Sequence, residues 1–100
     1  MIARGTTPTI QFTFKAVDTA DIAVCYLTMR EGDLVIEKTL EDAREVGNGL
    51  IEWSLTQEET LKLREEPVDI QVRYKTNDGH AFISKVFSVS PIQILKDGVI

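Results

Sequence analysis

The sequence has 100 residues, of which 43% are hydrophobic and 27% are charged, so it fits a single globular domain spanning residues 1–100. Its 16 acidic and 11 basic residues give a net charge of -5, which opposes nucleic-acid binding because that binding depends on cations that replace counterions. Residues 1–9 hold no apolar run that could form a signal peptide or a membrane span, so we expect cytoplasmic synthesis and no membrane partner. The one cysteine, Cys25, excludes an internal disulfide, and no spaced Cys and His residues predict a metal site.

The first predicted strand covers residues 9–14, which alternate between polar and apolar side chains. Ile10, Phe12 and Phe14 fall on one face, as expected for a strand with one buried side. We therefore expect these three side chains in the core.

The run at residues 22–30 differs because it is apolar on both faces of the predicted strand. Ile22, Val24 and Tyr26 line one face, and the other face carries an apolar row formed by Ala23, Cys25, Leu27 and Met29. This row is either covered within the monomer or exposed as an interface for another protein. Residues 31–33 predict a turn, and residues 34–40 return as the second strand of a hairpin.

Residues 41–49 allow two interpretations. Thr39 and Asp42 have the spacing that begins a helical turn. Gly47-Asn48-Gly49 instead suits a hairpin turn between a short strand near residues 43–46 and the next strand. We favour the hairpin.

The hydrophobic period changes within residues 49–67. Residues 51–55 alternate as a strand, with Trp53 on the apolar side, and Thr56 with Glu59 then has the spacing of a capping box. Pro67 disfavours helical geometry at the residue before it. We therefore predict one short helical turn at residues 56–63.

The C-terminal third predicts another hairpin. Residues 68–75 alternate cleanly, residues 76–79 form a turn because Asn, Asp and Gly tolerate positive φ, and residues 80–90 form the partner strand. Beyond Pro91, the apolar residues within 92–99 suggest a closing strand.

Two runs of the sequence match each other, one starting at Asp21 and one at Asp69, either through internal duplication or because both are hairpins of similar length. With the flanking strands they give about seven short strands in all. We predict an all-β fold, an immunoglobulin-like antiparallel β-sandwich with one short helical turn. The alternation predicts a core of Ile10, Phe12, Phe14, Ile22, Val24, Trp53, Leu55, Ile70, Val72 and Tyr74.

Few residues suggest catalysis or ligand binding. His80 is the only histidine and follows a turn glycine, without a strand-turn-helix elbow or a Gly-rich loop, so we expect no enzyme activity and no cofactor. The many carboxylates are best explained as a solvated acidic surface. Cys25 has no nearby base and is expected to be buried and inert, and Trp53 is in phase with the core rather than placed to stack on a sugar.

The sequence opens with MIARGTTPTIQFTF, carries WSLTQEETLKL at its centre and IQVRYK with a DG turn after it, and ends in ILKDGVI. With these stretches it resembles the small proteins of about 100 residues encoded in tail or structural modules of phages and prophages of Gram-positive bacteria. The resemblance implies a non-enzymatic β-sandwich that forms part of a virion or tail, and it assigns no functional residues.

Two functional hypotheses follow. The first is a phage or prophage structural protein of the tail, baseplate or neck, whose partners are other virion proteins and further copies of itself. The alternative is a small ligand- or carbohydrate-binding module. An exposed aromatic platform would favour the binding module, whereas a buried Trp53 together with an apolar interface would favour assembly.

Overall fold

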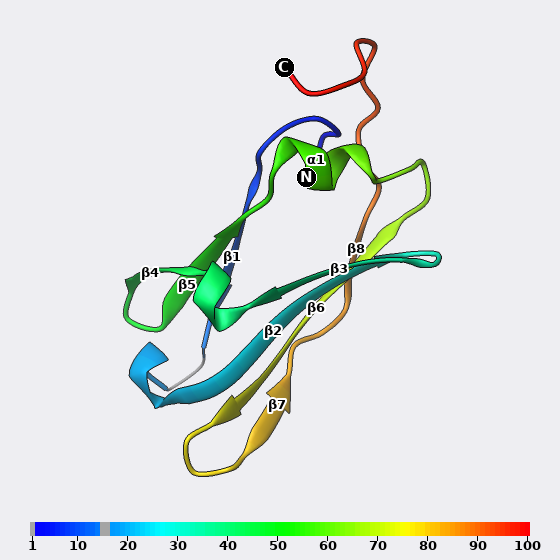
Figure 1. Cartoon of the computed structure of the whole chain (residues 1–100). Helices are drawn as coiled ribbons and strands as arrows, with labels where there is room; N and C mark the ends of the chain where they lie inside the picture. Colours follow the sequence, from blue (N-terminus) through cyan, green and yellow to red (C-terminus); the bar gives the residue numbers. More distant parts are fainter. Residues whose placement is uncertain (1, 15–16) are drawn as a thin grey trace.

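The computed structural model describes residues 2–14 and 17–100, and it consists of two antiparallel sheets with three short helical turns (Figure 1). This arrangement confirms the predicted all-β sandwich. The molecule is elongated, with principal dimensions of 47 × 25 × 17 Å. The α-helix lies at one end, and the hairpin that contains β7 lies at the opposite end (Figure 1).

The smaller sheet has the strand order β1-β5-β4, formed by β1 (Thr9–Thr13), β5 (Leu50–Ser54) and β4 (Arg44–Gly47). The turn between β4 and β5 is the predicted Gly47-Asn48-Gly49 turn, in which all three residues have positive φ. Gly49 is required there because a Cβ atom would lie 2.8 Å from the backbone oxygen of Val17. The favoured hairpin interpretation is therefore confirmed.

The larger sheet has the order β3-β2-β6, followed by an edge that two short strands share. Its long strands are β2 (Ile22–Glu31), β3 (Leu34–Thr39) and β6 (Val68–Thr76), and its edge consists of β7 (Ala81–Ile83) and β8 (Phe87–Val89). The single strand predicted at residues 80–90 is thus divided. Ser84 causes the division, because its hydroxyl accepts the Val72 N–H at 2.9 Å in place of a backbone carbonyl.

The three helical turns are η1 (Thr19–Asp21), η2 (Leu40–Asp42) and α1 (Gln57–Leu61). The predicted capping box of α1 is present, since the Glu59 N–H donates to the Thr56 hydroxyl at 3.1 Å and the Thr56 N–H donates to the Glu59 carboxylate at 2.9 Å. Thr39 and Asp42 cap η2 in the same way. Both interpretations of residues 41–49 therefore hold, because a helical turn precedes the hairpin.

The core lies between the two sheets and is centred on Trp53, whose side chain is completely buried and whose indole N–H donates to the Thr39 carbonyl at 2.8 Å. Most of the predicted core is confirmed, with Ile10, Phe12 and Tyr74 half-buried at its margin. Val24 is the exception, since it is 36% exposed. The buried apolar side chains are Ile2, Phe14, Ile22, Cys25, Leu27, Met29, Ile36, Ile51, Trp53, Leu55, Leu63, Val68, Ile70 and Val72.

A β-bulge in β2 explains why the predicted faces of this strand are wrong. The register shifts between Ile22, which pairs with Thr76, and Val24, which pairs with Lys75. The extra residue reverses the alternation beyond it, so the inward face after Ile22 begins at Cys25. The bulge also separates the two matching runs of the sequence, which start at Asp21 and Asp69. Val24 of the first run is exposed, whereas the matching Val72 of the second run is buried. The two runs therefore do not occupy equivalent positions.

Side-chain hydrogen bonds close the end of the sandwich at α1. The Arg4 guanidinium donates to the carbonyls of Leu63 at 2.7 Å and Leu61 at 2.9 Å, where the helix ends. The Thr60 hydroxyl donates to the Thr6 carbonyl at 2.9 Å. The buried carboxylate of Glu31 accepts the Arg64 N–H at 2.6 Å. These bonds join the N-terminal segment, α1 and β2 into one closed end.

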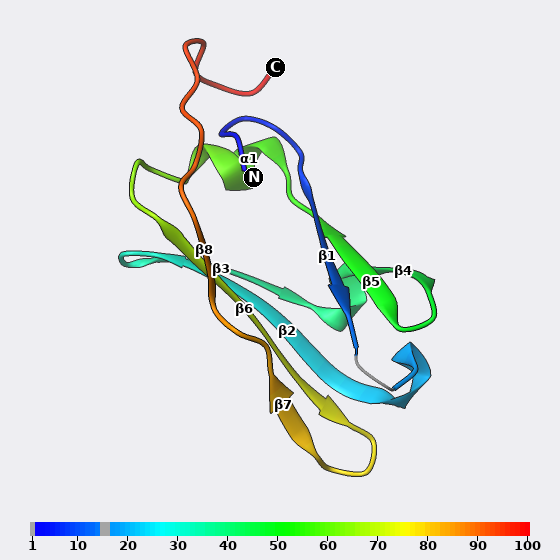
Figure 2. The ribbon, with the colours of Figure 1, turned by 180° about the vertical axis from the view of Figure 1, so that it is seen from behind.

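The prediction of a closing strand at residues 92–99 is wrong. Ile92 forms a single parallel bridge with Ala3, and beyond it the chain forms no strand. The last residue is held by Gln57, whose side chain bonds both the N–H of Ile100, at 2.8 Å, and its carbonyl, at 3.2 Å. β8 ends at Val89, opposite the first residue of β6, and the chain then continues to the α1 end and projects past it (Figures 1 and 2).

Candidate interaction surfaces

The apolar row predicted as an interface lies mostly inside the molecule. Cys25, Leu27 and Met29 are each at most 1% exposed, because the smaller sheet and α1 cover the face of β2 from which they project. Of the row, Ala23 alone is exposed, since it lies at the bulge. The interface prediction is therefore corrected for these three residues, and the alternative of burial within the monomer holds.

Burial also determines the state of the Cys25 thiol. It raises the pKa of this group from 9.0 to about 11, so the thiol stays protonated at neutral pH. A protonated, buried thiol is a poor nucleophile. The predicted inert cysteine is thus consistent with the structure.

His80 lies in the exposed turn between β6 and β7. Its Nδ1 atom is 3.1 Å from an Asp78 carboxylate oxygen, and both side chains are largely exposed. The pKa of Asp78 falls from 3.8 to about 2, because the Thr76 hydroxyl and then the side chain and backbone N–H of His80 donate hydrogen bonds to it. These contacts stabilise a turn, and no nucleophile within the described contacts uses the imidazole as a base.

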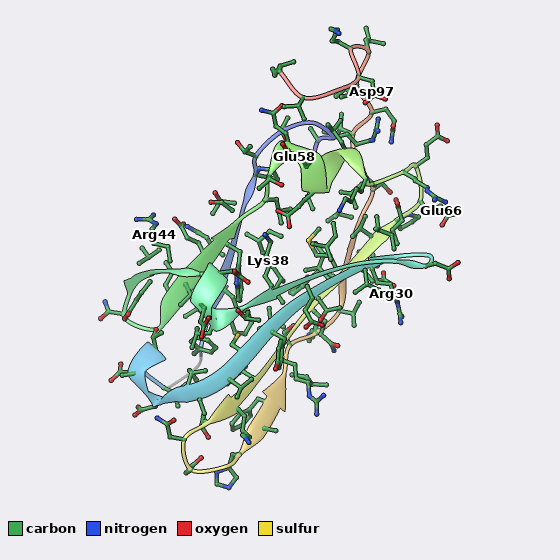
Figure 3. All side chains as sticks on the ribbon, in the orientation of Figure 1. Arg30, Lys38, Arg44, Glu58, Glu66 and Asp97 are labelled. Atoms are coloured by element: carbon green, nitrogen blue, oxygen red, sulfur yellow. The ribbon has the colours of Figure 1, made fainter. Side chains whose placement is uncertain are left out.

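The carboxylates with described partners hold strands and turns together. Arg44 and Gln11 donate to Glu52 across the smaller sheet, which lowers the pKa of Glu52. The Lys38 side chain extends from β3 between the sheets toward α1 (Figure 3), and its ammonium lies 2.7 Å from Glu59. Burial raises the pKa of Glu59, but the hydrogen bonds from Lys38 and Thr56 outweigh it and leave the pKa lowered. Among residues 2–14 and 17–100, no group of three or more His, Cys, Asp or Glu side chains is placed to hold a metal ion.

Exposed large apolar side chains are concentrated in the C-terminal part of the chain. Of the twelve exposed large hydrophobic side chains in the described residues, eight fall between positions 82 and 100. Phe82 (46% exposed) and Ile83 (67%) on β7, Phe87 (58%) on β8, and Val86 (55%) between these strands form a set that we call the exposed edge. The others belong to the C-terminal segment, namely Ile92, Leu95, Val99 and Ile100.

An aromatic cluster connects the exposed edge with the core. The Phe14 ring, which is buried, lies edge-on to Tyr74 with 4.8 Å between centroids, and Tyr74 stacks on Phe82 at 5.2 Å. Phe12 contacts both Phe14 and Tyr74. A partner that covers Phe82 would therefore extend the existing core rather than form a separate one.

A second surface is the outer face of the larger sheet, which neither the smaller sheet nor α1 covers. Its centre is Tyr26, 40% exposed, and Val24 beside it. A hollow of about 230 Å³ lies between these residues and Arg73 and Lys75 of β6, and another of about 340 Å³ lies on the other side toward Glu41.

The sequence carried a signal for the exposed edge that the alternation analysis missed. Residues 81–89, AFISKVFSV, are apolar on both strand faces, as residues 22–30 are. β2 lies in the centre of the sheet and buries one of its faces, whereas β7 and β8 form the margin of the sheet, so the same pattern buries Cys25, Leu27 and Met29 in β2 but leaves β7 and β8 largely exposed.

Comparisons of the chain with protein-family models, with curated proteins and with solved structures find no match. In the described part of the chain, no helix is long and apolar enough to cross a membrane.

Proposed function

We propose that this protein is a non-enzymatic structural component that acts through protein-protein assembly, and that the exposed edge together with the C-terminal segment is its main contact surface. The observation that carries the proposal is the concentration of exposed apolar side chains there. Isolated proteins seldom leave a contiguous apolar patch in water, because covering it is worth about 25 cal/mol per Å².

The form of this edge also supports assembly. Sheet edges in stable monomers are usually protected by very short strands, charged side chains, prolines or covering loops, because an open edge can pair with another chain, and of these devices the edge has short strands of three residues each. Within the exposed edge, Lys85 is the one charged residue between Ile83 and Phe87. A partner strand or an apolar surface could therefore approach β7 and β8 without displacing a salt bridge.

We propose that the assembly is a phage or prophage virion and that the protein belongs to its tail, baseplate or neck. This part of the proposal rests on the sequence resemblance alone. The proposed partners are other virion proteins and further copies of the chain. The burial of Trp53 removes that residue as a sugar-stacking platform and supports assembly, whereas the exposed rings of Tyr26, Phe82 and Phe87 keep a small ligand- or carbohydrate-binding module as the second proposal.

Deletion of the gene from the phage or prophage that carries it tests the proposal. We expect particles purified after induction to contain the protein by mass spectrometry, and the deletion to abolish their infectivity or leave them incomplete. Complementation with Ile83→Lys should fail although the variant folds, because Ile83 is 67% exposed in the monomer. Complementation with His80→Ala, an exposed turn variant, should succeed. Complete, infectious particles that lack the protein would refute the proposal.

A further inference from the structure

The outer face of the larger sheet carries an ordered pattern of charge. Across the strands, Thr39, Tyr26, Arg73 and Ile83 form one row, since Tyr26 pairs with both Thr39 and Arg73 and Ile83 pairs with Arg73. In the neighbouring row, Val24 and Ala81 flank Lys75. In these two rows the central strand β2 is thus apolar, and the strand on one side of it, β6, is basic.

The opposite side of β2 is acidic. Glu37 pairs with Thr28 on the outer face of β3, and Glu41 of η2 lines the hollow beside Tyr26. Both carboxylates are exposed, as are Arg73 and Lys75. Among the described residues, none of these four charged groups takes part in an ion pair.

We propose that this face binds the same face of a second copy, with a two-fold axis that runs along β2. Rotation by 180° about the strand direction places β2 over β2 and exchanges the two sides of the face. Arg73 and Lys75 of each copy then lie over the acidic side, with Glu37 and Glu41, of the other. Tyr26 and Val24 of both copies pack against each other at the centre, as a self-complementary two-fold contact requires.

The charge pattern selects this axis over the other two-fold arrangement of two facing sheets. An axis across the strands would place β6 over β6 and β3 over β3, so the contact would bring like charges together. Like charges at an interface cost several kcal/mol and are a common means of excluding a wrong orientation. A face with an acidic side, an apolar centre and a basic side therefore matches a second copy better than a partner of uniform charge.

The size of the face sets the expected affinity. With the axis along β2, the three strands β3, β2 and β6 lie over their counterparts, and at about 4.8 Å between strands and about six residues of about 3.4 Å each they span about 14 × 20 Å. This area is smaller than that of standard specific interfaces and corresponds to weak, transient contacts, so we expect a dissociation constant on the order of 100 µM. The face uses none of the exposed apolar residues of the C-terminal segment, and the inference goes beyond the proposed assembly surface.

Reciprocal charge exchange tests the contact. Sedimentation velocity from about 5 to about 500 µM, a range that spans the expected dissociation constant, should show the wild type passing from monomer to dimer. The double variants Arg73→Glu/Lys75→Glu and Glu37→Lys/Glu41→Lys should each weaken dimerisation about tenfold or more, because each places like charges over one another. An equimolar mixture of the two variants should restore the dimer, since both halves of the mixed contact are then complementary.

The control is Lys96→Glu/Glu58→Lys, which exchanges two exposed charges away from this face. It should dimerise as the wild type does, and the circular dichroism of all variants should be unchanged because every altered residue is exposed. A wild type that is monomeric throughout the range would overturn the proposal. So would dimers that persist in both double variants, or a mixture that stays monomeric. This test is independent of the proposed exposed-edge function because it alters none of the four exposed-edge residues, and Ile83, at the end of the Tyr26 row, stays unchanged in every variant.

Discussion

The α1 end and the exposed edge are two margins of the same sandwich with opposite properties. At the α1 end, Arg4, Thr60 and Glu31 bind the backbone groups of neighbouring segments, and Thr60 is completely buried. At the exposed edge, four large apolar side chains project into solvent from two short strands and the segment between them. The chain thus binds the backbone groups of the α1 end with its own side chains, but it leaves the apolar residues of the exposed edge, and those of the C-terminal segment that projects past the α1 end, in solvent. Apolar side chains left in solvent at these two places are best explained by a partner.

The largest difference should appear between neighbours on opposite faces of β2. Leu27→Lys places a charge in the core and should cost more than about 4 kcal/mol, enough to unfold a domain of marginal stability. Tyr26→Lys, one residue earlier on the outer face, should change stability by about 0.5 kcal/mol. Urea unfolding measures both. A folded, stable Leu27→Lys protein would show that β2 does not have the faces described.

A matched pair of aromatic residues compares the core with the exposed edge. Trp53→Ala leaves a cavity and removes the bond to the Thr39 carbonyl, so it should lower the free energy of unfolding by about 3–5 kcal/mol. Phe87→Ala should lower it by less than about 1 kcal/mol, because Phe87 is 58% exposed. Equal losses in thermal or urea unfolding would mean that the edge is part of the monomer core.

The closed margin can be weakened at Glu31. Glu31→Ala leaves the Arg64 N–H without its acceptor in a buried place and should cost about 1–3 kcal/mol. Glu31→Gln keeps an acceptor oxygen at the same position and should cost less. Urea unfolding of the two variants tests this order, and a Glu31→Ala protein as stable as the wild type would show that the bond does not contribute.

The smallest expected effect concerns Asp78, in the turn before the exposed edge. Its pKa is lowered from 3.8 to about 2. The ionised carboxylate therefore stabilises the fold fully at a pH above 3.8, and this contribution disappears as the pH falls toward 2. Asp78→Asn should therefore be less stable than the wild type at pH 7, and the two should converge near pH 2. A difference that is constant from pH 7 to pH 2 would contradict the cause given for the shift.

Patterns that depend on neighbouring residues were predictable from the sequence. The alternation of residues 9–14 and 68–75 gave β1 and β6, and the spacing of Thr56 and Glu59 gave the start of α1, because each depends on contacts within a few residues. The burial of Trp53 followed from its phase in β5.

Features that depend on tertiary contacts were not predictable. The bulge beyond Ile22 is set by pairing with β6, and it reversed the expected faces of β2. The break at Ser84 depends on a hydrogen bond to a different strand. The position of β7 and β8 at the margin of the sheet, which makes their apolar residues a candidate contact surface, depends on the strand order. Alternation alone could not distinguish that margin from the centre.

Site-specific photo-crosslinking tests the role of the exposed edge most directly. A photoreactive phenylalanine analogue at Phe87 is compared with the same analogue at Val46, which is 46% exposed on β4 at the other side of the molecule. In host cells that produce the particle, we predict that position 87 crosslinks to another protein of the particle or to a second copy, and that position 46 does not. Absence of a crosslink at position 87 in assembled particles, or equal crosslinking at both positions, would contradict the assignment of this edge as the contact surface.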